Sequence, residues 1–321
     1  MPRQSIDTLM RDYTGDVPGA SVIVIRNGDV VFRKSYGMAS LEARIASTPQ
    51  THYRLASVTK QFTAAAILIL ADRGTLSLDD RITRFLPTLP ENDITIRQLL
   101  THTSGLLDYE DLIPPGTTSQ LKDADVLHLL ESQRSTYFPP GSRFRYSNTG
   151  FAFLALIVER ASGERFADFL RENIFTPLGM HSTIAFEEGV STVVNRAYGY
   201  SREGTGWRRT DQSLTSAVLG DGGIYTSVDD LVKWVAALEN GRFSVASQPV
   251  VETGDPTRPR YGFGWYIGEH ARKRVVFHTG ETIGFRNALV RFPDQHLAVI
   301  VLTNRNDGTP YNTALVIADR F

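Results

Sequence analysis

Ser57 and Lys60 stand three positions apart in the stretch RLASVTKQFTAAAILILADRG, residues 54–74. On a helix these two positions share a face, so the hydroxyl and the ammonium group can meet. Residues 62–71 are almost all apolar, which predicts a buried helix. A lysine at the start of such a helix is costly unless it is paired or has lost its proton. Because a desolvated lysine can take a proton from a serine, the pattern indicates nucleophilic catalysis.

The same S-x-x-K spacing occurs again at Ser119 and Lys122, in PPGTTSQLKDADVL. This copy lies among Pro, Gly and Thr ahead of a polar helix, so we expect a loop and a helix cap there. A two-residue pattern of this kind is expected about once by chance in a chain of ordinary composition. The assignment of Ser57 and Lys60 therefore needs support from elsewhere in the chain.

Two further stretches give that support. Tyr146-Ser147-Asn148 stands just before an apolar helix, and His278-Thr279-Gly280 ends a β-like run. Each residue also has a structural interpretation: a packed tyrosine, an asparagine helix cap, a strand histidine. In this order, however, a serine–lysine pair, Y-x-N and a basic or histidine residue before Thr-Gly resemble the motif triplet of the serine penicillin-recognising enzymes.

The resemblance runs from about Val17 to the end of the chain. Further similar stretches are IRQLLTHTSGL, GDGGIYTSVDDLVKW and YGFGWYIG. The chain looks most like the branch that contains class C β-lactamases, D-alanyl-D-alanine carboxypeptidases, D-aminopeptidases and β-lactamase-like esterases. That resemblance implies a β-lactamase/transpeptidase-like fold.

The resemblance also implies the roles of the residues. Ser57 is expected to be the nucleophile, Lys60 to hold its proton network or act as base, and Tyr146 to be a general base that returns the proton to the leaving group. The implied substrate-binding residues are Asn148, His278, Thr279, Gly280 and Glu281. Within this set the Asn148 amide is expected to bind a substrate carbonyl, and the backbone N–H groups of Ser57 and Glu281 to form the oxyanion hole.

His278 is a departure, because most class C β-lactamases have lysine there, whereas histidine resembles the peptidase and esterase branches. A largely neutral imidazole attracts a substrate carboxylate weakly, so we do not expect strong β-lactamase activity. A carboxylate would need another cation, and Lys273, Arg274 and Arg286 are near in sequence. Two other features have structural interpretations: His102 at a helix end, and a tight backbone near the cleft at Gly222 and Gly223.

The leading prediction is a serine hydrolase that acts through an acyl-enzyme on an ester or amide bond, with esterase activity favoured. The alternatives are a D-amino-acid peptidase (carboxypeptidase or aminopeptidase), a weak class C-like β-lactamase, or a non-catalytic relative that binds peptidoglycan fragments or a partner. The chain has no G-x-S-x-G, H-E-x-x-H, P-loop or Rossmann pattern, and we expect no metal and no organic cofactor.

Composition narrows the class of protein further. The 321 residues are 41% hydrophobic and 21% charged with a net charge of -1, which does not indicate a nucleic-acid partner. Cysteine is absent, which excludes disulfides and thiol nucleophiles. We expect a small-molecule or peptide substrate and no membrane span; oligomeric state stays open. Residues 1–20 have no signal-peptide core, so we expect a periplasmic or secreted protein if a leader was removed, and otherwise a cytoplasmic one.

The elements that must position these residues follow from periodicity and turn signals. Hairpins are predicted at 20–36, around Asn-Gly, and at 285–304, turning at Pro-Asp. Helices are predicted at 123–133, 151–163, 166–175 and 227–241. The fold class is therefore α/β (α+β): an antiparallel sheet built from both chain termini, flanked by helices, with a mainly helical insertion. The predicted division is 1–75 with 215–321 for the sheet, and 76–214 for the helical subdomain, in one β-lactamase-like domain.

Overall fold

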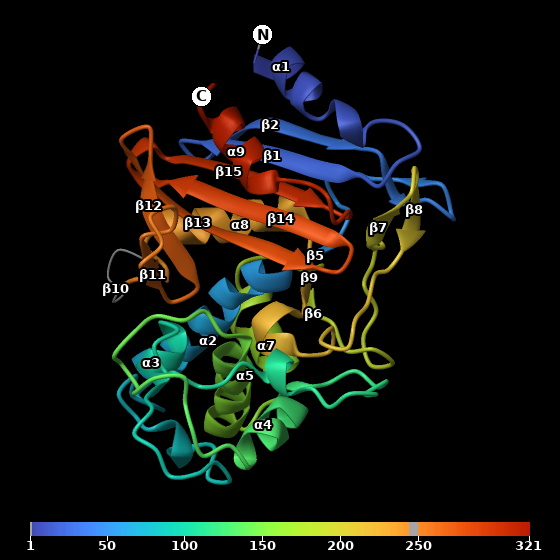
Figure 1. The fold of residues 1–321 in the computed structure, drawn as a ribbon. Helices are drawn as coiled ribbons and strands as arrows, with labels where there is room; N and C mark the ends of the chain where they lie inside the picture. The colour runs from blue at the N-terminus through green and yellow to red at the C-terminus, as the bar shows by residue number, and fades with distance from the viewer. Residues whose placement is uncertain (1, 244–249) are drawn as a thin grey trace.

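A large antiparallel sheet is built from both ends of the chain (Figure 1). The computed structural model describes residues 2–243 and 250–321, and within them this sheet has eight strands in the order β10-β11-β12-β13-β14-β15-β1-β2. Its strands are β1 (Ala20–Arg26), β2 (Asp29–Tyr36), β10 (Val251–Glu252), β11 (Arg260–Gly262), β12 (Trp265–His270), β13 (Lys273–Thr282), β14 (Phe285–Phe292) and β15 (Leu297–Thr303). The predicted fold class is confirmed.

Both predicted hairpins are present. β1 and β2 turn at Asn27 and Gly28, whose φ values of 53° and 85° are the left-handed conformation that a two-residue hairpin turn requires. β14 and β15 are joined through the 3₁₀ turn η7 (Pro293–Gln295). These hairpins place the N-terminal strand β1 directly beside the C-terminal strand β15.

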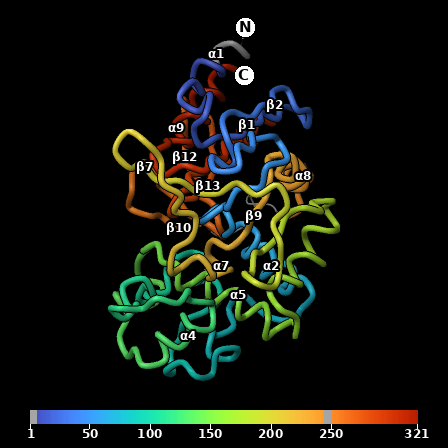
Figure 2. The backbone as a smooth tube through the Cα atoms, turned by 90° about the vertical axis from the view of Figure 1, so that its right-hand side faces the viewer, coloured from blue at the N-terminus to red at the C-terminus, as the bar shows by residue number. Residues whose placement is uncertain are grey.

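Helices cover both faces of the sheet (Figure 2). Val22 and Val24 pack with residues of α1 (Pro2–Leu9) and α9 (Pro310–Ala318), whereas Ile23 and Ile25 belong to the core on the other face. That second core includes α8 (Val228–Glu239). Strands that bury both faces read as continuous β-branched runs, as the sequence of β1 does.

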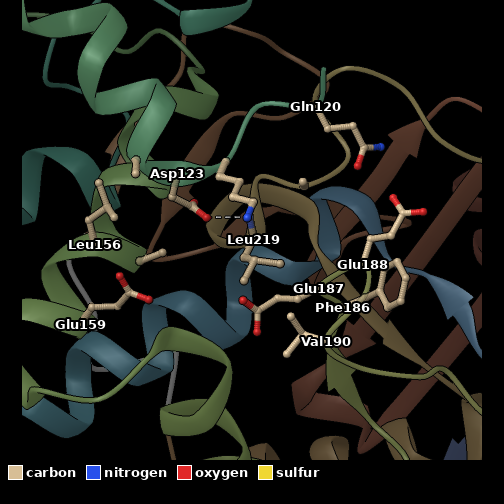
Figure 3. A pocket seen from close by; sticks show the side chains of 13 residues that line it. Gln120, Asp123, Leu156, Glu159, Phe186, Glu187, Glu188, Val190 and Leu219 are labelled. Atoms are coloured by element: carbon tan, nitrogen blue, oxygen red, sulfur yellow. Dashed lines mark hydrogen bonds between the residues drawn. The ribbon is translucent and has the colours of Figure 1, made fainter. Parts of the chain in front are cut away.

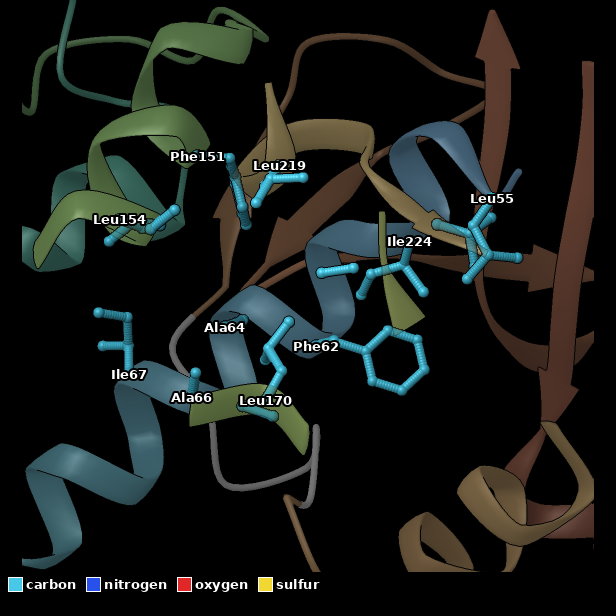
Figure 4. Packing of buried hydrophobic residues seen from close by; sticks show 14 of the residues in the cluster. Leu55, Phe62, Ala64, Ala66, Ile67, Phe151, Leu154, Leu170, Leu219 and Ile224 are labelled. Atoms are coloured by element: carbon cyan, nitrogen blue, oxygen red, sulfur yellow. The ribbon is translucent and has the colours of Figure 1, made fainter. Parts of the chain in front are cut away.

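The second core continues into the helical part of the molecule. Phe62 of α2 (Lys60–Asp72) lies 4.4 Å from Trp234 of α8 between ring centroids. Figure 4 shows α2 side chains between those of α5 (Asn148–Ser162), α6 (Phe166–Leu170) and α7 (Leu219–Gly222). The helices of this part are α2 (Lys60–Asp72), α3 (Ile96–Leu100), α4 (Asp123–Glu131), α5 (Asn148–Ser162), α6 (Phe166–Leu170) and α7 (Leu219–Gly222). No helix of the described residues is long and apolar enough to cross a membrane.

Short elements join the two parts. The remaining strands are β3 (Met38–Ser40), β4 (Ile45–Ala46), β5 (Tyr53–Arg54), β6 (Ile184–Ala185), β7 (Tyr200–Glu203), β8 (Gly206–Arg209) and β9 (Ile224–Thr226). The short turns are η1 (Arg11–Tyr13), η2 (Ala56–Thr59), η3 (Ile82–Arg84), η4 (Tyr109–Leu112) and the π turn η5 (Arg171–Phe175). Since 76–214 holds α3 to α6 together with β6 to β8, the division at residues 75 and 215 stays a prediction.

The predicted helices are found with shifted ends. α5 begins at Asn148, three residues before the predicted start, and ends at Ser162, with Gly163 as its C-cap at a φ of 78°. α8 is capped as predicted, because the Ser227 hydroxyl accepts a hydrogen bond from Asp230 N. The predicted helix at 166–175 is α6 followed by the π turn η5.

Candidate active site

Ser57 lies in η2, one turn ahead of α2, and its side chain is partly exposed. The sequence placed Ser57 and Lys60 on one helix; the structure instead starts the α-helix at Lys60 and gives Ser57 a 3₁₀ turn. Ala56, just before the serine, has a φ of 50°, a left-handed conformation that is strained for a residue with a Cβ. Strain of this kind at a bend is typical of a functional turn.

Lys60 makes the predicted contact with Ser57. Its Nζ lies 3.0 Å from Ser57 Oγ, 2.8 Å from Asn148 Oδ1 and 2.9 Å from Asp221 O. The last two partners can only accept hydrogen bonds, so they take two N–H groups of the amine. In the neutral form the lone pair of Nζ is then free to accept the Ser57 proton.

Burial favours that neutral form of Lys60. Desolvation lowers the pKa of Lys60 to about 8, against the carboxylates of Asp221, Asp108 and Glu110, which act to raise it. A lysine with this pKa is about one-tenth neutral at pH 7, far more than an ordinary lysine. The site thus supplies a base next to the serine hydroxyl.

Tyr146 stands on the other side of the amine. Lys60 Nζ lies 5.1 Å from the centre of the Tyr146 ring. Burial raises the pKa of Tyr146 well above its ordinary value, although a hydrogen bond with Ser57 opposes this. Tyr146 is therefore a phenol at neutral pH, able to pass a proton on but poorly suited to be the resting base.

His102, for which the sequence indicates a structural role, packs against the ring of Tyr146. The two ring centres are 4.3 Å apart, and His102 Nδ1 accepts a hydrogen bond from the Ser147 N–H at 3.3 Å. Burial lowers the pKa of His102, so the ring stays neutral. It holds the segment that carries Tyr146 without reaching Ser57.

Asn148 is engaged at both ends of its amide. Oδ1 accepts from Lys60, and Nδ2 donates to Glu110 Oε1 at 3.0 Å. The sequence predicted that this amide faces a substrate carbonyl. In the structure the amide links Lys60 to Glu110 and uses one of the two N–H groups of Nδ2. The second N–H group can donate to a substrate carbonyl, so that role stays a prediction.

β13 closes the site on its other side. β12 pairs with β13 only as far as Phe277, which leaves the segment from His278 to Thr282 with one free edge facing η2. At Gly280 the strand approaches so closely that a Cβ would lie 2.0 Å from Leu55 O. This contact requires glycine and sets the backbone of Glu281 beside the serine turn.

His278 lies under the site and does not line it. Its side chain is 1% exposed; Nδ1 donates to Thr279 O at 2.6 Å and Nε2 accepts from Tyr261 Oη at 3.3 Å. Burial lowers the pKa of His278 to about 3. The ring is neutral, as expected, but it packs among tyrosines rather than facing a ligand.

A cleft of about 270 Å³ opens at Ser57. It is lined by Arg54, Ala56, Ser57, Glu110, Asn148, Ser213, Thr215, Asp221, Gly222, Glu281, Thr282 and Ile283. The lining includes one cation and three carboxylates, and Glu281 is 62% exposed at its side chain. Acidic side chains therefore outnumber basic ones in the lining, although Glu281 is paired with Arg286.

Arg54 is the cation of the cleft, and sequence reasoning missed it. Its guanidinium donates to Ser216 O at 2.9 Å and to Gly222 O at 3.3 Å. Of the cations considered from sequence, Lys273 and Arg274 begin β13 at the far end from the site. Arg286 does not line the cleft, but it pairs with Glu281, which does. The signal for Arg54 was its position three residues before Ser57, on the strand that leads into the serine turn.

Asp221 and Tyr109 were also missed. Tyr109 Oη donates to Asp221 Oδ2 at 2.9 Å, and desolvation raises the pKa of Asp221 to about 6. Neither residue belongs to a sequence motif with a recognisable spacing. Only the folding of the chain brings them close to Lys60. Gly222 lines the cleft beside Ala56, where a Cβ would have ordinary contact at 3.5 Å, whereas a Cβ at Gly223 would lie 2.7 Å from Leu219 Cα. The tight backbone predicted for this pair is therefore found at Gly223.

The second S-x-x-K copy lies on the surface, away from the cleft. Ser119 and Lys122 are both exposed, and Lys122 is the residue before α4, as the predicted helix cap. Neither lines the cleft at Ser57. Among the described residues, no group of three or more His, Cys, Asp or Glu side chains is arranged to hold a metal ion.

The serine, the buried lysine and the tyrosine lie where the sheet meets the helical part of the molecule. This arrangement defines a class of serine hydrolases that use a lysine in place of the histidine of a catalytic triad. The chain belongs to the Beta-lactamase family, whose model matches residues 3–320. It is a serine hydrolase of the β-lactamase-like family.

Relatives of known name cover most of the chain. Penicillin-binding protein 4* of Bacillus subtilis is 32% identical over 93% of this chain and 70% of its own length. A D-aminopeptidase of Brucella suis biovar 1 is 31% identical over 93% of this chain, which spans 58% of that protein.

Solved structures agree on the fold. The penicillin-binding protein of Bacillus halodurans is 30% identical, with a TM-score of 0.85, over 98% of this chain and 99% of that one. The octameric penicillin-binding protein homologue from Pyrococcus abyssi is 27% identical, with a TM-score of 0.87, over 100% of this chain and 77% of that one.

Proposed function

We propose that Ser57 is acylated by esters and amides with Lys60 as the base. Ser57 Oγ attacks the acyl carbon while its proton passes to Lys60 Nζ, and the carbonyl oxygen becomes an oxyanion. The backbone N–H groups of Ser57 and Glu281 are the donors assigned to that oxyanion. The supporting observation is the Nζ–Oγ distance of 3.0 Å, with the other two contacts of Nζ made to acceptors.

The proton then reaches the leaving group through Tyr146. Its phenol hydrogen-bonds to Ser57 and its ring lies beside Lys60, so it can donate as the leaving-group bond breaks and recover a proton from Lys60. A water molecule next attacks the acyl carbon, the ester bond to Ser57 Oγ breaks, and the proton returns to the serine. Asn148 positions Lys60 in every step.

The charges of the cleft guide the choice of substrate. Glu110, Asp221 and Glu281 line it, and the guanidinium of Arg54 is already bound to backbone carbonyls. Neutral esters and amides fit these charges better than β-lactams or peptide C-termini, which carry a carboxylate. This supports esterase-type activity with weak turnover of β-lactams.

A second candidate is the hydrolysis of amides that carry a free amine next to the scissile carbonyl. The three carboxylates of the cleft favour an ammonium group, and one relative is named a D-aminopeptidase. Rates on D-alanine p-nitroanilide and on p-nitrophenyl butyrate separate the two candidates. An aminopeptidase should hydrolyse the anilide, which carries the free amine. An esterase that needs no amine should hydrolyse the butyrate ester much faster than the anilide.

A fluorophosphonate probe tests the proposal as a whole. The serine oxygen displaces fluoride from phosphorus, and peptide mapping by mass spectrometry then locates the adduct. One adduct on Ser57, absent from Ser57→Ala and retained in Ser119→Ala, is expected. An unreactive wild-type protein would support a non-catalytic binding role.

A further inference from the structure

The short helix α7 forms the wall of the cleft behind Lys60. Asp221 O accepts from Lys60 Nζ at 2.9 Å, and Gly220 O accepts from the Thr63 hydroxyl at 2.7 Å. The helix also packs tightly on α5, since a Cβ at Gly220 would lie 2.2 Å from Phe151 O. The position of the Asp221 carbonyl thus depends on what holds α7.

Asp123 holds α7 from the side opposite the cleft. Its carboxylate accepts hydrogen bonds from Leu219 N at 2.9 Å and Gly220 N at 3.0 Å, and so satisfies the first N–H groups of that helix. Asp123 is 8% exposed and is the first residue of α4. Helix α4, remote from the serine in sequence, is thereby tied to the segment that carries Asp221.

A cavity of about 490 Å³ lies behind α7 and is distinct from the cleft (Figure 3). Leu219 lines this cavity, whereas Asp221 and Gly222 line the cleft at Ser57, so α7 separates the two spaces. Figure 3 shows Asp123 directed at the Leu219 N–H, with Glu159 on the wall below. With open space behind it, α7 is held on this side by the Asp123 carboxylate.

We propose that Asp123 is a positioning residue for acylation: it fixes α7 from behind, and α7 holds the Asp221 carbonyl against Lys60. The inference rests on the proposed function, because it assigns Lys60 as the base. If the Asp221 carbonyl were held less firmly, Lys60 Nζ could move out of hydrogen-bond alignment with Ser57 Oγ. Acylation would then slow, because small misplacements of a catalytic group lower the rate strongly.

Asp123→Asn tests this, because the amide keeps the size of the side chain but offers a donor to one of the two N–H groups. Asp125→Asn is the matched control: Asp125 is exposed in the same first turn of α4 and accepts only from Lys122 N. Rates of fluorophosphonate labelling are measured per reactive serine. We expect about a tenfold loss for Asp123→Asn and no change for Asp125→Asn.

The pH dependence of labelling distinguishes positioning from stability. Lys60 faces the carboxylates of Asp221, Asp108 and Glu110, which stay in place in the variant, and burial raises the pKa of Asp123 itself to about 7. The ammonium form of Lys60 loses more from a loosened carbonyl than the amine does, so the pKa of Lys60 falls. The midpoint should move to lower pH by about half a unit in Asp123→Asn. Thr63→Val, which releases α7 from the cleft side, should move it in the same direction. A residue that serves only stability would lower Tm and the number of reactive serines without moving the midpoint.

An unchanged rate and midpoint in Asp123→Asn would overturn the proposal, and so would a variant that does not fold, because Asp123 would then serve the fold as a whole. Failure of the wild-type protein to label at Ser57 is a different result. It rejects the proposed function itself, whatever the variants do.

Discussion

Lys60 Nζ lies 3.0 Å from Ser57 Oγ, and its two other partners, Asn148 Oδ1 and Asp221 O, can only accept hydrogen bonds. This arrangement suits an amine that donates twice and receives the serine proton. Because burial lowers the pKa of Lys60 and raises that of Tyr146, the lysine is the better base at neutral pH.

The nucleophile is tested by two serine substitutions. Ser57→Ala should remove nearly all turnover of p-nitrophenyl butyrate, since loss of a covalent route costs several orders of magnitude. Ser119→Ala, in the exposed second copy of the spacing, should leave turnover unchanged. Equal losses in the two variants would show that Ser57 has been assigned wrongly.

Lys60 and Tyr146 should act as one proton network. Lys60→Ala and Tyr146→Phe are each expected to slow acylation by about two to four orders of magnitude, the scale of general-base loss. The double variant should lose little more than the worse single variant. Lys122→Ala is the control, and burst kinetics measure acylation; additive losses would mean that the two residues do not share a task.

Glu281 should bias the cleft against anions through its side chain, while the oxyanion hole uses its backbone. Glu281→Gln is expected to raise the ratio of kcat/KM for nitrocefin to that for p-nitrophenyl butyrate by a few-fold, about 0.5–1 kcal/mol for an exposed charge. Activity on the ester should stay nearly constant. A fall in both activities would place the Glu281 side chain in the chemistry instead.

Gly280 should be intolerant of any side chain. In Gly280→Ala the new Cβ would meet Leu55 O at 2.0 Å, so β13 must move away from the serine turn. Overpacking of this kind costs about 1–3 kcal/mol of stability, and acylation should fall as well. Gly206→Ala is the control, because a Cβ there would lie 3.8 Å from Glu203 O. Equal melting temperatures for the two variants would contradict the close approach.

Much of the fold was predictable because it depends on local signals. The Asn27-Gly28 turn fixes one hairpin, and the capping of α8 at Ser227 needs only near neighbours. The serine–lysine contact was predicted too, although through an α-helix rather than a 3₁₀ turn. Local spacing is enough for such features.

Other parts of the site depend on contacts between distant segments. Asp221 reaches the cleft only through tertiary packing and carries no spacing signal. Arg54 is near Ser57 in the sequence, but its contacts with Ser216 O and Gly222 O come from a distant segment. His278 was expected to face the substrate, but β13 turns its ring into a cluster of tyrosines. Asn148 was expected to bind a substrate carbonyl, and the sequence did not indicate that one of its N–H groups donates to Glu110. Sequence gives residue types at these positions, but not the neighbours that decide their roles.

The most direct test of Lys60 as the base is the pH dependence of fluorophosphonate labelling at Ser57, measured in the wild type and in Lys60→Ala. With Lys60 as base, the wild-type rate should rise through a midpoint near pH 8, because the amine appears as the pH passes the pKa of Lys60. Lys60→Ala should label slowly, without that midpoint. A wild-type rate that rises only above the ordinary pKa of tyrosine, or a midpoint that survives in Lys60→Ala, would contradict the assignment of Lys60 as the base.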